Sequence, residues 1–478
     1  MLQHDTLFIG GDWMAPASTG TIDVVSPHTE EIIARVPDGT PADMDRAVAA
    51  ARTAFDHGPW PRMTMPERAA VVARLAEVYA ARQAEIADII TLEMGSPITF
   101  SQLAQAPQPL GMLQYFAQLG QTFEVEDQRP GMFGPVTVRR EPVGVVAAIV
   151  PWNVPQFVIM TKLAPALIAG CTVVIKPAPE TPLDGYLLGE MIKEAGIPDG
   201  VVSIVAAGRE AGEHLVAHPG VDKVAFTGST AAGRRIGAIC GEQLKRCSLE
   251  LGGKSAAIIL DDCDLPSAMG FLSIASLLNS GQACVAQTRI LASHSRYDEV
   301  VQAVAEMVTG QTVGDPGDPA TAIGPMVAKR QQERVENYIR IGLDEGAKTV
   351  VGGLDRPFDR GWYVSPTVFA NAANDMRIAR EEIFGPVLTV IPYDDEADAV
   401  RIANDSDYGL SGSVWTADAD HGMDVARRVR AGTYGVNMMN TMEPSTPFGG
   451  YKASGLGREL GPEGLAAYLE YKSIARLG

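Results

Sequence analysis

The chain has 478 residues, 46% of them hydrophobic and 20% charged, which is the balance of a globular protein and not of a disordered one. At roughly 100–200 residues per domain, this length predicts two to four domains. Thirty-nine basic residues against 58 acidic ones leave a net charge of −19. Such a surface repels nucleic acids and anionic membranes unless a local basic patch opposes the mean, and the sequence has no such patch. We therefore expect neither a nucleic acid nor a membrane as a partner.

Apolar stretches and cysteines indicate where the chain resides. The most apolar stretch, residues 143–150, ends at Pro151 and is far shorter than the ~20 residues that a membrane-spanning helix needs. The first residues, MLQHDTLFIGGDW, lack the basic and apolar regions of a secretory signal. The five cysteines form no C-x-x-C pair, and an odd number cannot all pair within one chain. We expect a reduced, cytoplasmic protein in which an unpaired cysteine can act as a nucleophile.

Taken in chain order, the patterns predict an α/β protein. Amphipathic helices at 41–55 and 66–93 come first. Two short alternating segments around a Pro-Gly turn within 121–142 then predict a projecting hairpin. Strands separated by helices are expected next, at 141–150, 172–176, 201–207, 223–228 and 255–260. This alternation indicates βαβ crossovers and a parallel sheet, and a second α/β segment follows with strands near 288–293, 385–393 and 411–416.

Two stretches place a reactive side chain among glycine or apolar neighbours. GQACVAQTR (281–289) puts Cys284 shortly after a glycine, and a thiolate is a strong nucleophile even at the few per cent present at pH 7. SLELGGKSA (248–256) puts Glu250 between two leucines, where a carboxylate must be paired or have a raised pKa. A raised pKa suits a general base that works near neutral pH. Taken singly, an inert core cysteine and an ordinary strand-end carboxylate are the alternatives.

Two further stretches follow predicted strands, where α/β proteins bind their ligands. Asn153, in IVPWNVPQF, lies after a buried strand and could donate a hydrogen bond to a developing oxyanion; capping the next helix is its alternative role. AFTGSTAAGRR (225–235) reads as strand, glycine turn and helix, and the free N–H groups of such a helix start favour an anion such as a pyrophosphate. It lacks the G-x-G-x-x-G fingerprint, so this signal is weak alone.

One pair of histidines has a spacing that could suit a metal ion. His214 and His218 are four residues apart on a predicted helix. They lack the intervening glutamate of a zincin motif, and no third ligand lies nearby in the sequence. We expect a solvated helix face and no metal site.

In this order, these elements closely resemble the NAD(P)-dependent aldehyde dehydrogenase superfamily. The likeness runs from GDWMAPASTGTIDVVSPHTEEIIARVP to PFGGYKASGLGRELG (447–461), and it is most specific in LELGGKSA, GQACVAQTR and EEIFGPV (381–387). It implies an α/β fold with a Rossmann-like cofactor domain at 1–122 and 143–249 and an α/β catalytic domain at 250–446. It also implies a small β oligomerisation arm formed by 123–142 with the C-terminal segment 447–478.

The resemblance also implies a role for each matching residue. Cys284 corresponds to the catalytic thiol, Glu250 to the general base, Asn153 to the oxyanion donor, and Lys162 to a lysine near the base. The implied cofactor contacts are Ile149, Trp152, Lys176, Gly208, Gly228, Ser229, Glu382 and Phe384. The implied substrate wall consists of Phe157, Val158, Leu278, Val285 and Met442. Because this wall is apolar and flexible, we expect a medium-sized aliphatic, terpenoid or aromatic aldehyde rather than a charged one.

One departure from the family pattern concerns the cofactor. Many NAD-preferring members carry a Glu three residues after the cofactor lysine, but here Pro179 occupies that position and Glu180 follows it. We expect NAD and keep NADP as the alternative.

The implied reaction oxidises an aldehyde to the carboxylic acid through a Cys284 thiohemiacetal and thioester, which water activated by Glu250 hydrolyses. A CoA-acylating dehydrogenase and an esterase-type hydrolase are the alternative enzymes, and a non-catalytic protein of the same fold is a third reading. The arm and the C-terminal strand pair across subunits in the family, so a homodimer or homotetramer is expected.

Overall fold

An eight-stranded sheet organises the first half of the protein, whose computed structural model describes residues 2–439 and 442–477. Its five parallel strands are β8 (Val145–Ile149), β9 (Thr172–Lys176), β10 (Val202–Ile204), β11 (Lys223–Thr227) and β12 (Arg246–Glu250). In the order β12-β11-β8-β9-β10, the chain places β9 and β10 on one side of β8 and then β11 and β12 on the other side. The switch point therefore lies between β8 and β11, where open α/β sheets bind ligands. Antiparallel β2 (Leu7–Ile9) with β3 (Asp12–Met14) and β22 (Gly455–Leu456) extend the two edges.

Helices cover both faces of this sheet. One face packs against α1 (Pro41–His57), α8 (Arg209–Ala217) and α9 (Thr230–Glu242). The other packs against α2 (Met65–Ala81), α5 (Pro107–Thr122), α6 (Pro155–Ala169) and α7 (Leu183–Glu194). Strands β8 and β9 are buried along their whole length, which explains their unbroken apolar sequence. Gly170, with φ of 96°, ends α6.

The predicted helix 66–93 is wrong in one respect, because the structure divides it. It consists of α2 and α3 (Gln83–Met94), which meet at Arg82. The Arg82 backbone has φ of −113° and ψ of 12°, and its guanidinium pairs with Glu190 of α7 at 2.9 Å. This bend lets α3 pack against α7 while α2 packs against α5.

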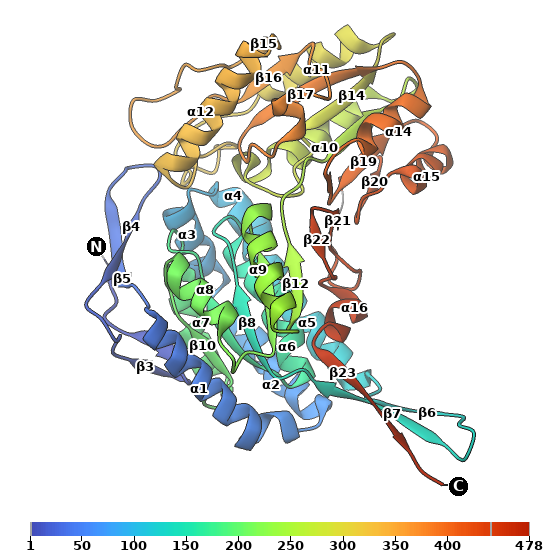
Figure 1. Cartoon of the computed structure of the whole chain (residues 1–478). Coiled ribbons are helices and arrows are strands. Elements are labelled where there is room, and N and C mark those ends of the chain that lie inside the picture. The colour runs from blue at the N-terminus through green and yellow to red at the C-terminus, as the bar shows by residue number, and fades with distance from the viewer. Residues whose placement is uncertain (1, 440–441, 478) are drawn as a thin grey trace.

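A seven-stranded sheet organises the second α/β body, which lies above the first in Figure 1. Its order is β15 (Lys348–Val351), β16 (Thr367–Ala370), β17 (Val387–Tyr393), β14 (Arg289–Ser293), β13 (Ala256–Ile259), β19 (Gly412–Trp415) and β20 (Gly435–Val436). All pairs are parallel except β15 with β16. The covering helices are α10 (Leu265–Leu277), α11 (Tyr297–Thr309), α12 (Lys329–Asp344), α14 (Glu396–Asn404) and α15 (Ala419–Arg428). The strands expected at 255–260, 288–293, 385–393 and 411–416 are confirmed to within two residues at each end.

A three-stranded antiparallel arm projects from the first body (Figure 1). The predicted hairpin is confirmed as β6 (Glu126–Arg129) and β7 (Val136–Pro142). The C-terminal strand β23 (Leu469–Ala475) pairs with β7 of the same chain, from Leu469 opposite Pro142 to Ala475 opposite Val136. Two strands of the predicted arm, β7 and β23, therefore pair with each other within one chain.

Smaller elements complete the described structure. They are a sheet of β1 (Leu2–Gln3), β5 (Ile32–Pro37) and β4 (Thr21–Val25), a ribbon of β18 (Tyr408–Gly409) and β21 (Tyr451–Lys452), and the short helices α4 (Ile98–Phe100), α13 (Arg377–Arg380) and α16 (Gly461–Ala466). A π-helical turn at Ser101–Gln105 joins α4 to α5, and single 3₁₀ turns lie at Trp60–Arg62 and Leu278–Gly281. Within the described residues, no helix combines the length and the apolar character needed to cross a membrane.

Candidate active site

The three most specific sequence motifs meet because two glycines allow backbone segments to approach one another. A Cβ on Gly253, in LELGGKSA, would lie 2.2 Å from the Cys284 carbonyl oxygen. A Cβ on Gly281, in GQACVAQTR, would lie 2.4 Å from the carbonyl oxygen of Gly385, in EEIFGPV. Gly281 also has a positive φ of 73°. Larger residues at these positions would push the motifs apart, so the close approach of the motifs requires glycine at 253 and 281.

Parallel strands bring several of the predicted residues to one sheet edge. Ile149 at the end of β8 pairs in register with Lys176 at the end of β9, and Thr227 at the end of β11 pairs with Glu250 at the end of β12. Asn153 follows β8 by four residues. This edge faces the second body, which supplies Cys284 from the turn after α10. The site thus lies between the two sheets.

Cys284 lies where two cavities meet. It lines a large cavity of about 790 Å³ together with Glu250, and a smaller cleft of about 240 Å³ together with Glu382. Burial, followed by the nearby Glu382 and Glu250 carboxyls, raises the pKa of the Cys284 thiol to about 12. The protein alone therefore keeps this thiol protonated at neutral pH, and forming the thiolate requires a change in these surroundings.

Asn153 is held in place by the turn that precedes Cys284. It is buried, and its Nδ2 donates to the Gln282 carbonyl oxygen at 2.9 Å. Asn279 Nδ2 in turn donates to the Asn153 carbonyl oxygen at 2.8 Å. An amide nitrogen carries two N–H donors, so one remains for a ligand. Because Asn153 lines both cavities beside Cys284, its position fits the predicted oxyanion donor.

Glu250 is a buried carboxyl at the end of β12. It is 3% exposed, and neither of its oxygens finds a partner among the described residues. Burial and the neighbouring Glu459 carboxyl raise its pKa well above the usual range. Since it also lines the large cavity, it can accept a proton from a molecule bound there. The carboxyl alone, however, would be costly to ionise without a nearby cation.

Lys162 supplies that cation, and it is paired with Glu459, a residue that was not predicted from the sequence. Lys162 is fully buried, and its Nζ lies 2.7 Å from Glu459 Oε1 and donates to Thr227 Oγ1 at 2.6 Å. The Lys162 charge lowers the pKa of Glu250, opposing burial. The expectation of a lysine near the base is therefore met in space. Glu459 lies in the short GREL stretch, and no pattern there distinguishes it from a surface carboxylate.

The smaller cleft contains most of the predicted cofactor residues. Trp152, Gly228, Ser229, Glu382 and Phe384 all line it. The Trp152 and Phe384 rings pack edge to face, with their centroids 5.4 Å apart. Gly253 N–H donates to Glu382 Oε1 at 3.0 Å, while burial raises the Glu382 pKa to about 7. Ser229 caps α9 by accepting from Ala232 N–H at 3.3 Å, so the cleft includes the start of a 13-residue helix.

Helix α12 supports this cleft from the second body and was not predicted to do so. Gln331 Nε2 donates to the Phe384 carbonyl oxygen at 2.9 Å, and Arg334 donates to that of Glu382 at 2.6 Å. Arg334 and Gln331 also line the cleft. These contacts hold the backbone on either side of Ile383, where Phe384 has a positive φ of 66°.

Three of the predicted cofactor residues, Lys176, Gly208 and Ile149, do not line the cleft. Lys176 is 6% exposed, donates to the Pro177 carbonyl oxygen at 2.9 Å, and has its pKa lowered to about 8 by burial. Gly208 is the N-cap of α8 and donates to Asp38 Oδ1 at 3.2 Å. Glu180, the residue after Pro179, forms an ion pair with Arg330 at the start of α12. Both Glu180 and Asp38 act electrostatically on Lys176.

All five predicted substrate-wall residues line the large cavity. Phe157 and Val158 come from α6, Leu278 and Val285 flank Cys284 in the chain, and Met442 comes from the loop after β20. The rest of the wall was not predicted and includes Leu103, Ile274 and Met439. Leu103 is 76% exposed, which places the wall's edge at the surface. The cavity is mostly apolar and is large enough for a drug-sized molecule.

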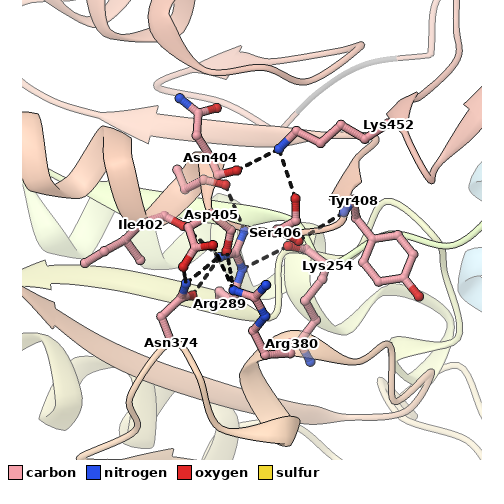
Figure 2. Close-up of polar contacts among 11 residues, drawn as sticks. Lys254, Arg289, Asn374, Arg380, Ile402, Asn404, Asp405, Ser406, Tyr408 and Lys452 are labelled. Atoms are coloured by element: carbon pink, nitrogen blue, oxygen red, sulfur yellow. Dashed lines mark hydrogen bonds and ion pairs between the residues drawn. The ribbon is translucent and has the colours of Figure 1, made fainter.

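Arg289, the last residue of the GQACVAQTR motif, supports the site without lining either cavity. Figure 2 shows its guanidinium among backbone and side-chain oxygens. It donates to the Lys254 carbonyl oxygen at 3.0 Å, to Asn374 Oδ1 at 2.9 Å and to the Ile402 carbonyl oxygen at 3.0 Å. It thereby ties the segment after Glu250 to the second body. Lys254 is itself buried, and its Nζ has no hydrogen-bond partner among the described residues.

The histidine pair contacts an acidic residue. His214 Nε2 lies 2.6 Å and His218 Nε2 lies 3.4 Å from Asp45 Oδ1 on α1. In the part of the chain that the structure describes, no group of three or more potential ligands is placed to hold a metal ion.

Comparison with known proteins defines the class of protein to which this fold and site belong. The model of the aldehyde dehydrogenase family matches residues 13–474. Geranial dehydrogenase of Castellaniella defragrans is 49% identical over 478 residues, which cover 100% of both chains. The chain belongs to the aldehyde dehydrogenase family, and the predicted NAD(P)-dependent aldehyde dehydrogenase is confirmed at this level.

Solved structures agree over nearly the whole chain. An aldehyde dehydrogenase of Mycobacterium tuberculosis complexed with NAD+ is 49% identical with a TM-score of 0.98, covering 100% of this chain and 99% of that one. Aldehyde dehydrogenase C of Pseudomonas syringae, complexed with NAD+ and octanal, is 41% identical with a TM-score of 0.95, covering 98% and 96%. The predicted fold class is therefore confirmed.

Proposed function

We propose that this protein oxidises medium-sized apolar aldehydes to carboxylic acids, with NAD as the preferred hydride acceptor. The single observation that carries the proposal is the position of Cys284 at the junction of a large apolar cavity and a smaller, more polar cleft. A nucleophile there can hold an aldehyde on one side while a cofactor lies on the other. Orientation of two reactants in this way lowers the barrier to their reaction.

Four residues divide the chemistry between them. The Cys284 thiolate attacks the aldehyde carbon, and Asn153 Nδ2 with the Cys284 backbone N–H donates to the oxyanion that forms. Loss of hydride leaves a thioester on Cys284. Glu250 takes a proton from water that attacks this thioester, and the acid leaves as Cys284 is released. The Lys162 charge favours the ionised form of Glu250 in its buried position.

The residues of the cleft fit a nicotinamide dinucleotide. Bound there, NAD+ supplies the hydride acceptor. Ser229 and the start of α9 suit the pyrophosphate, Glu382 suits the hydroxyls of the nicotinamide ribose, and Lys176 suits the adenosine ribose. Ile149, Trp152, Gly208, Gly228 and Phe384 shape the walls between these points.

NAD rather than NADP is supported by the charges around Lys176. The Glu180 and Asp38 carboxylates both act on Lys176, and they would repel the additional phosphate of NADP. Pro179 removes the usual glutamate, but Glu180, fixed by Arg330, keeps a carboxylate in this region.

The substrate class is supported by the cavity wall and by two relatives. The wall residues Phe157, Val158, Leu278, Val285 and Met442 offer apolar contacts. Geranial is a medium-sized apolar aldehyde, and octanal is the ligand in one similar structure. Glu250 and Glu459 are carboxyl groups that line this cavity, and they disfavour an anionic substrate.

Assembly, domain division and location complete the proposal. We propose the domains stated above, with β22 of the C-terminal segment joining the first sheet. A homodimer or homotetramer is supported by the arm, where Met132 and Phe133 are 89% and 77% exposed. The five free cysteines support a reduced, cytoplasmic setting.

The test mixes the purified protein with an aldehyde panel and either NAD or NADP, and follows reduced nicotinamide at 340 nm. We expect reduction with octanal and geranial, faster with NAD, and none with the Cys284→Ala variant. Absence of reduction with every aldehyde and both cofactors would refute the dehydrogenase. Release of acid from activated esters without any redox step would favour the hydrolase, and a requirement for CoA would favour the acylating enzyme.

A further inference from the structure

The turn that precedes Cys284 has an unusual backbone conformation. Asn279, Ser280 and Gly281 are consecutive residues with positive φ angles of 53°, 61° and 73°. Glycine adopts this left-handed region freely, whereas other residues enter it at a cost in free energy and stay there only when their surroundings hold them. The side chains of Asn279 and Ser280 therefore need contacts that hold this turn.

The Asn279 side chain contacts the two carbonyl groups that define the position of Asn153. Its Nδ2 donates to the Asn153 carbonyl oxygen at 2.8 Å and to the Gln282 carbonyl oxygen at 3.4 Å. The Gln282 carbonyl oxygen also accepts from Asn153 Nδ2 at 2.9 Å. One amide group thus connects the backbone of Asn153 with the acceptor that orients the Asn153 side chain.

These contacts determine the orientation of the Asn279 amide. Asn279 is 2% exposed, and its Oδ1 has no hydrogen-bond partner among the residues that the structure describes. Exchanging the two amide atoms would place Oδ1 against two carbonyl oxygens, which can only accept hydrogen bonds. A buried acceptor without a partner lowers stability, and so does a left-handed backbone at asparagine. Because such strain clusters at active sites, these two costs at one residue indicate a functional role.

Gln282 fixes the other end of this connection to the second body. It is fully buried, its Nε2 donates to the Pro325 carbonyl oxygen at 3.4 Å, and its Oε1 accepts from Val327 N–H at 3.0 Å. Its backbone N–H donates to the Asn279 carbonyl oxygen at 3.1 Å, which closes the turn. Asn153, in contrast, follows β8 of the first body. The Asn279 amide therefore holds a residue of the first body against a turn of the second.

We propose that Asn279 is a positioning residue that sets the direction of the Asn153 amide toward the substrate oxyanion. This inference rests on the proposed function, in which Asn153 Nδ2 stabilises that oxyanion. One N–H of this nitrogen points to the Gln282 carbonyl oxygen. Because the two N–H bonds of a planar amide have a fixed angle between them, the direction of the other depends on how Asn153 lies relative to Gln282. Asn279 lines neither cavity, so it acts through Asn153.

Two glycine variants separate the role of the Asn279 amide from that of the backbone conformation. Asn279→Gly tolerates the positive φ but lacks the amide, whereas the matched Ser280→Gly variant lacks a hydroxyl that accepts from Gly324 N–H at 2.9 Å. With octanal and NAD, kcat of Asn279→Gly should fall about 10–100-fold at an unchanged KM for NAD, because a misplacement of about 1 Å can cost ~10² in rate. Ser280→Gly should stay within about threefold of the unaltered protein. Equal losses in both variants would overturn the proposal.

A double variant tests whether Asn279 acts through Asn153. In protein that already carries Asn153→Ala, the Asn279→Gly change should lower kcat by less than about twofold, since no side-chain amide remains to be positioned. The same fold loss with and without the Asn153 amide would contradict a positioning role. Asn279→Ala, which removes the same amide and keeps the Cβ, serves both measurements should the glycine variant not fold.

A structural measurement tests the same claim without reference to activity. In a crystal structure of cofactor-free Asn279→Gly, the hydrogen bond from Asn153 Nδ2 to the Gln282 carbonyl oxygen should be lost or the Asn153 side chain should occupy several conformers. The Ser280→Gly structure should keep this bond. An unchanged Asn153 in the Asn279→Gly structure would overturn the proposal, even in an active enzyme. Aldehyde oxidation by the unaltered protein tests the proposed function separately, so either can fail alone.

Discussion

The two cavities that meet at Cys284 are built from different kinds of residue. The cleft of about 240 Å³ is lined by strand ends, glycines, one carboxylate and two aromatic rings, which fix a ligand through directional contacts. The cavity of about 790 Å³ is lined mostly by apolar side chains from α6, α10 and loops far apart in the sequence. The first arrangement suits one ligand of fixed shape. The second suits a range of apolar molecules, because burial of apolar surface is not directional.

The residues of both cavities affect the ionisation of the Cys284 thiol. The carboxyls of Glu382 in the cleft and Glu250 in the cavity both oppose ionisation of the thiol. A cationic nicotinamide in the cleft would oppose them and favour the thiolate. Occupation of the cleft is therefore expected to activate the nucleophile that faces the cavity.

Of three graded effects that follow from this comparison, the largest concerns Asn153, which both cavities share. Asn153→Ala removes the oxyanion donor, and losing one such donor costs ~10²–10³ in kcat. Steady-state rates with saturating octanal and NAD measure it, and NAD affinity by fluorescence should change little because the cleft keeps Ser229 and Glu382. A loss of less than about tenfold, with the fold intact by thermal unfolding, would place the oxyanion elsewhere.

The next effect tests the electrostatics on the cleft side. Because the thiol pKa of Cys284 is raised to about 12, its thiolate fraction below that pKa rises tenfold for each pH unit. Alkylation of Cys284 in the cofactor-free protein, measured by peptide mass spectrometry, should thus be about 100-fold faster at pH 9 than at pH 7. A plateau within this range would show that the thiol ionises without the cofactor.

The smallest effect tests the cavity side. Each methylene buried in an apolar wall contributes ~0.8 kcal/mol, which corresponds to about fourfold in kcat/KM. A series of linear aldehydes from butanal to octanal should show this increment until the cavity is full. A flat series, or faster oxidation of a semialdehyde of equal length, would contradict an apolar substrate wall.

The cleft could be predicted from the sequence more fully than the large cavity. Cys284, Glu250 and the Glu382–Phe384 pair lie in compact motifs whose neighbours have to be small, as Gly253 and Gly281 show. Such positions leave a pattern in the sequence, and the strand ends follow from buried apolar runs. The positions of these residues were accordingly predictable.

The remaining parts arise only from tertiary packing. Glu459 meets Lys162 because the C-terminal segment folds back against α6, and its own sequence neighbours give no sign of this. Leu103 and Ile274 join the cavity wall from separate helical segments for the same reason. The break at Arg82 was missed because the amphipathic pattern continues through it, while α3 packs against α7 only after the bend.

The most direct test of the central claim is pre-steady-state kinetics of the Glu250→Gln variant with octanal and NAD. Thioester formation needs Cys284 and the cleft, whereas its hydrolysis needs the buried base in the cavity. We expect a burst of about one reduced nicotinamide per active site, followed by steady-state turnover ~10²–10⁴-fold slower than in the unaltered protein. Normal steady-state turnover by this variant would contradict the account.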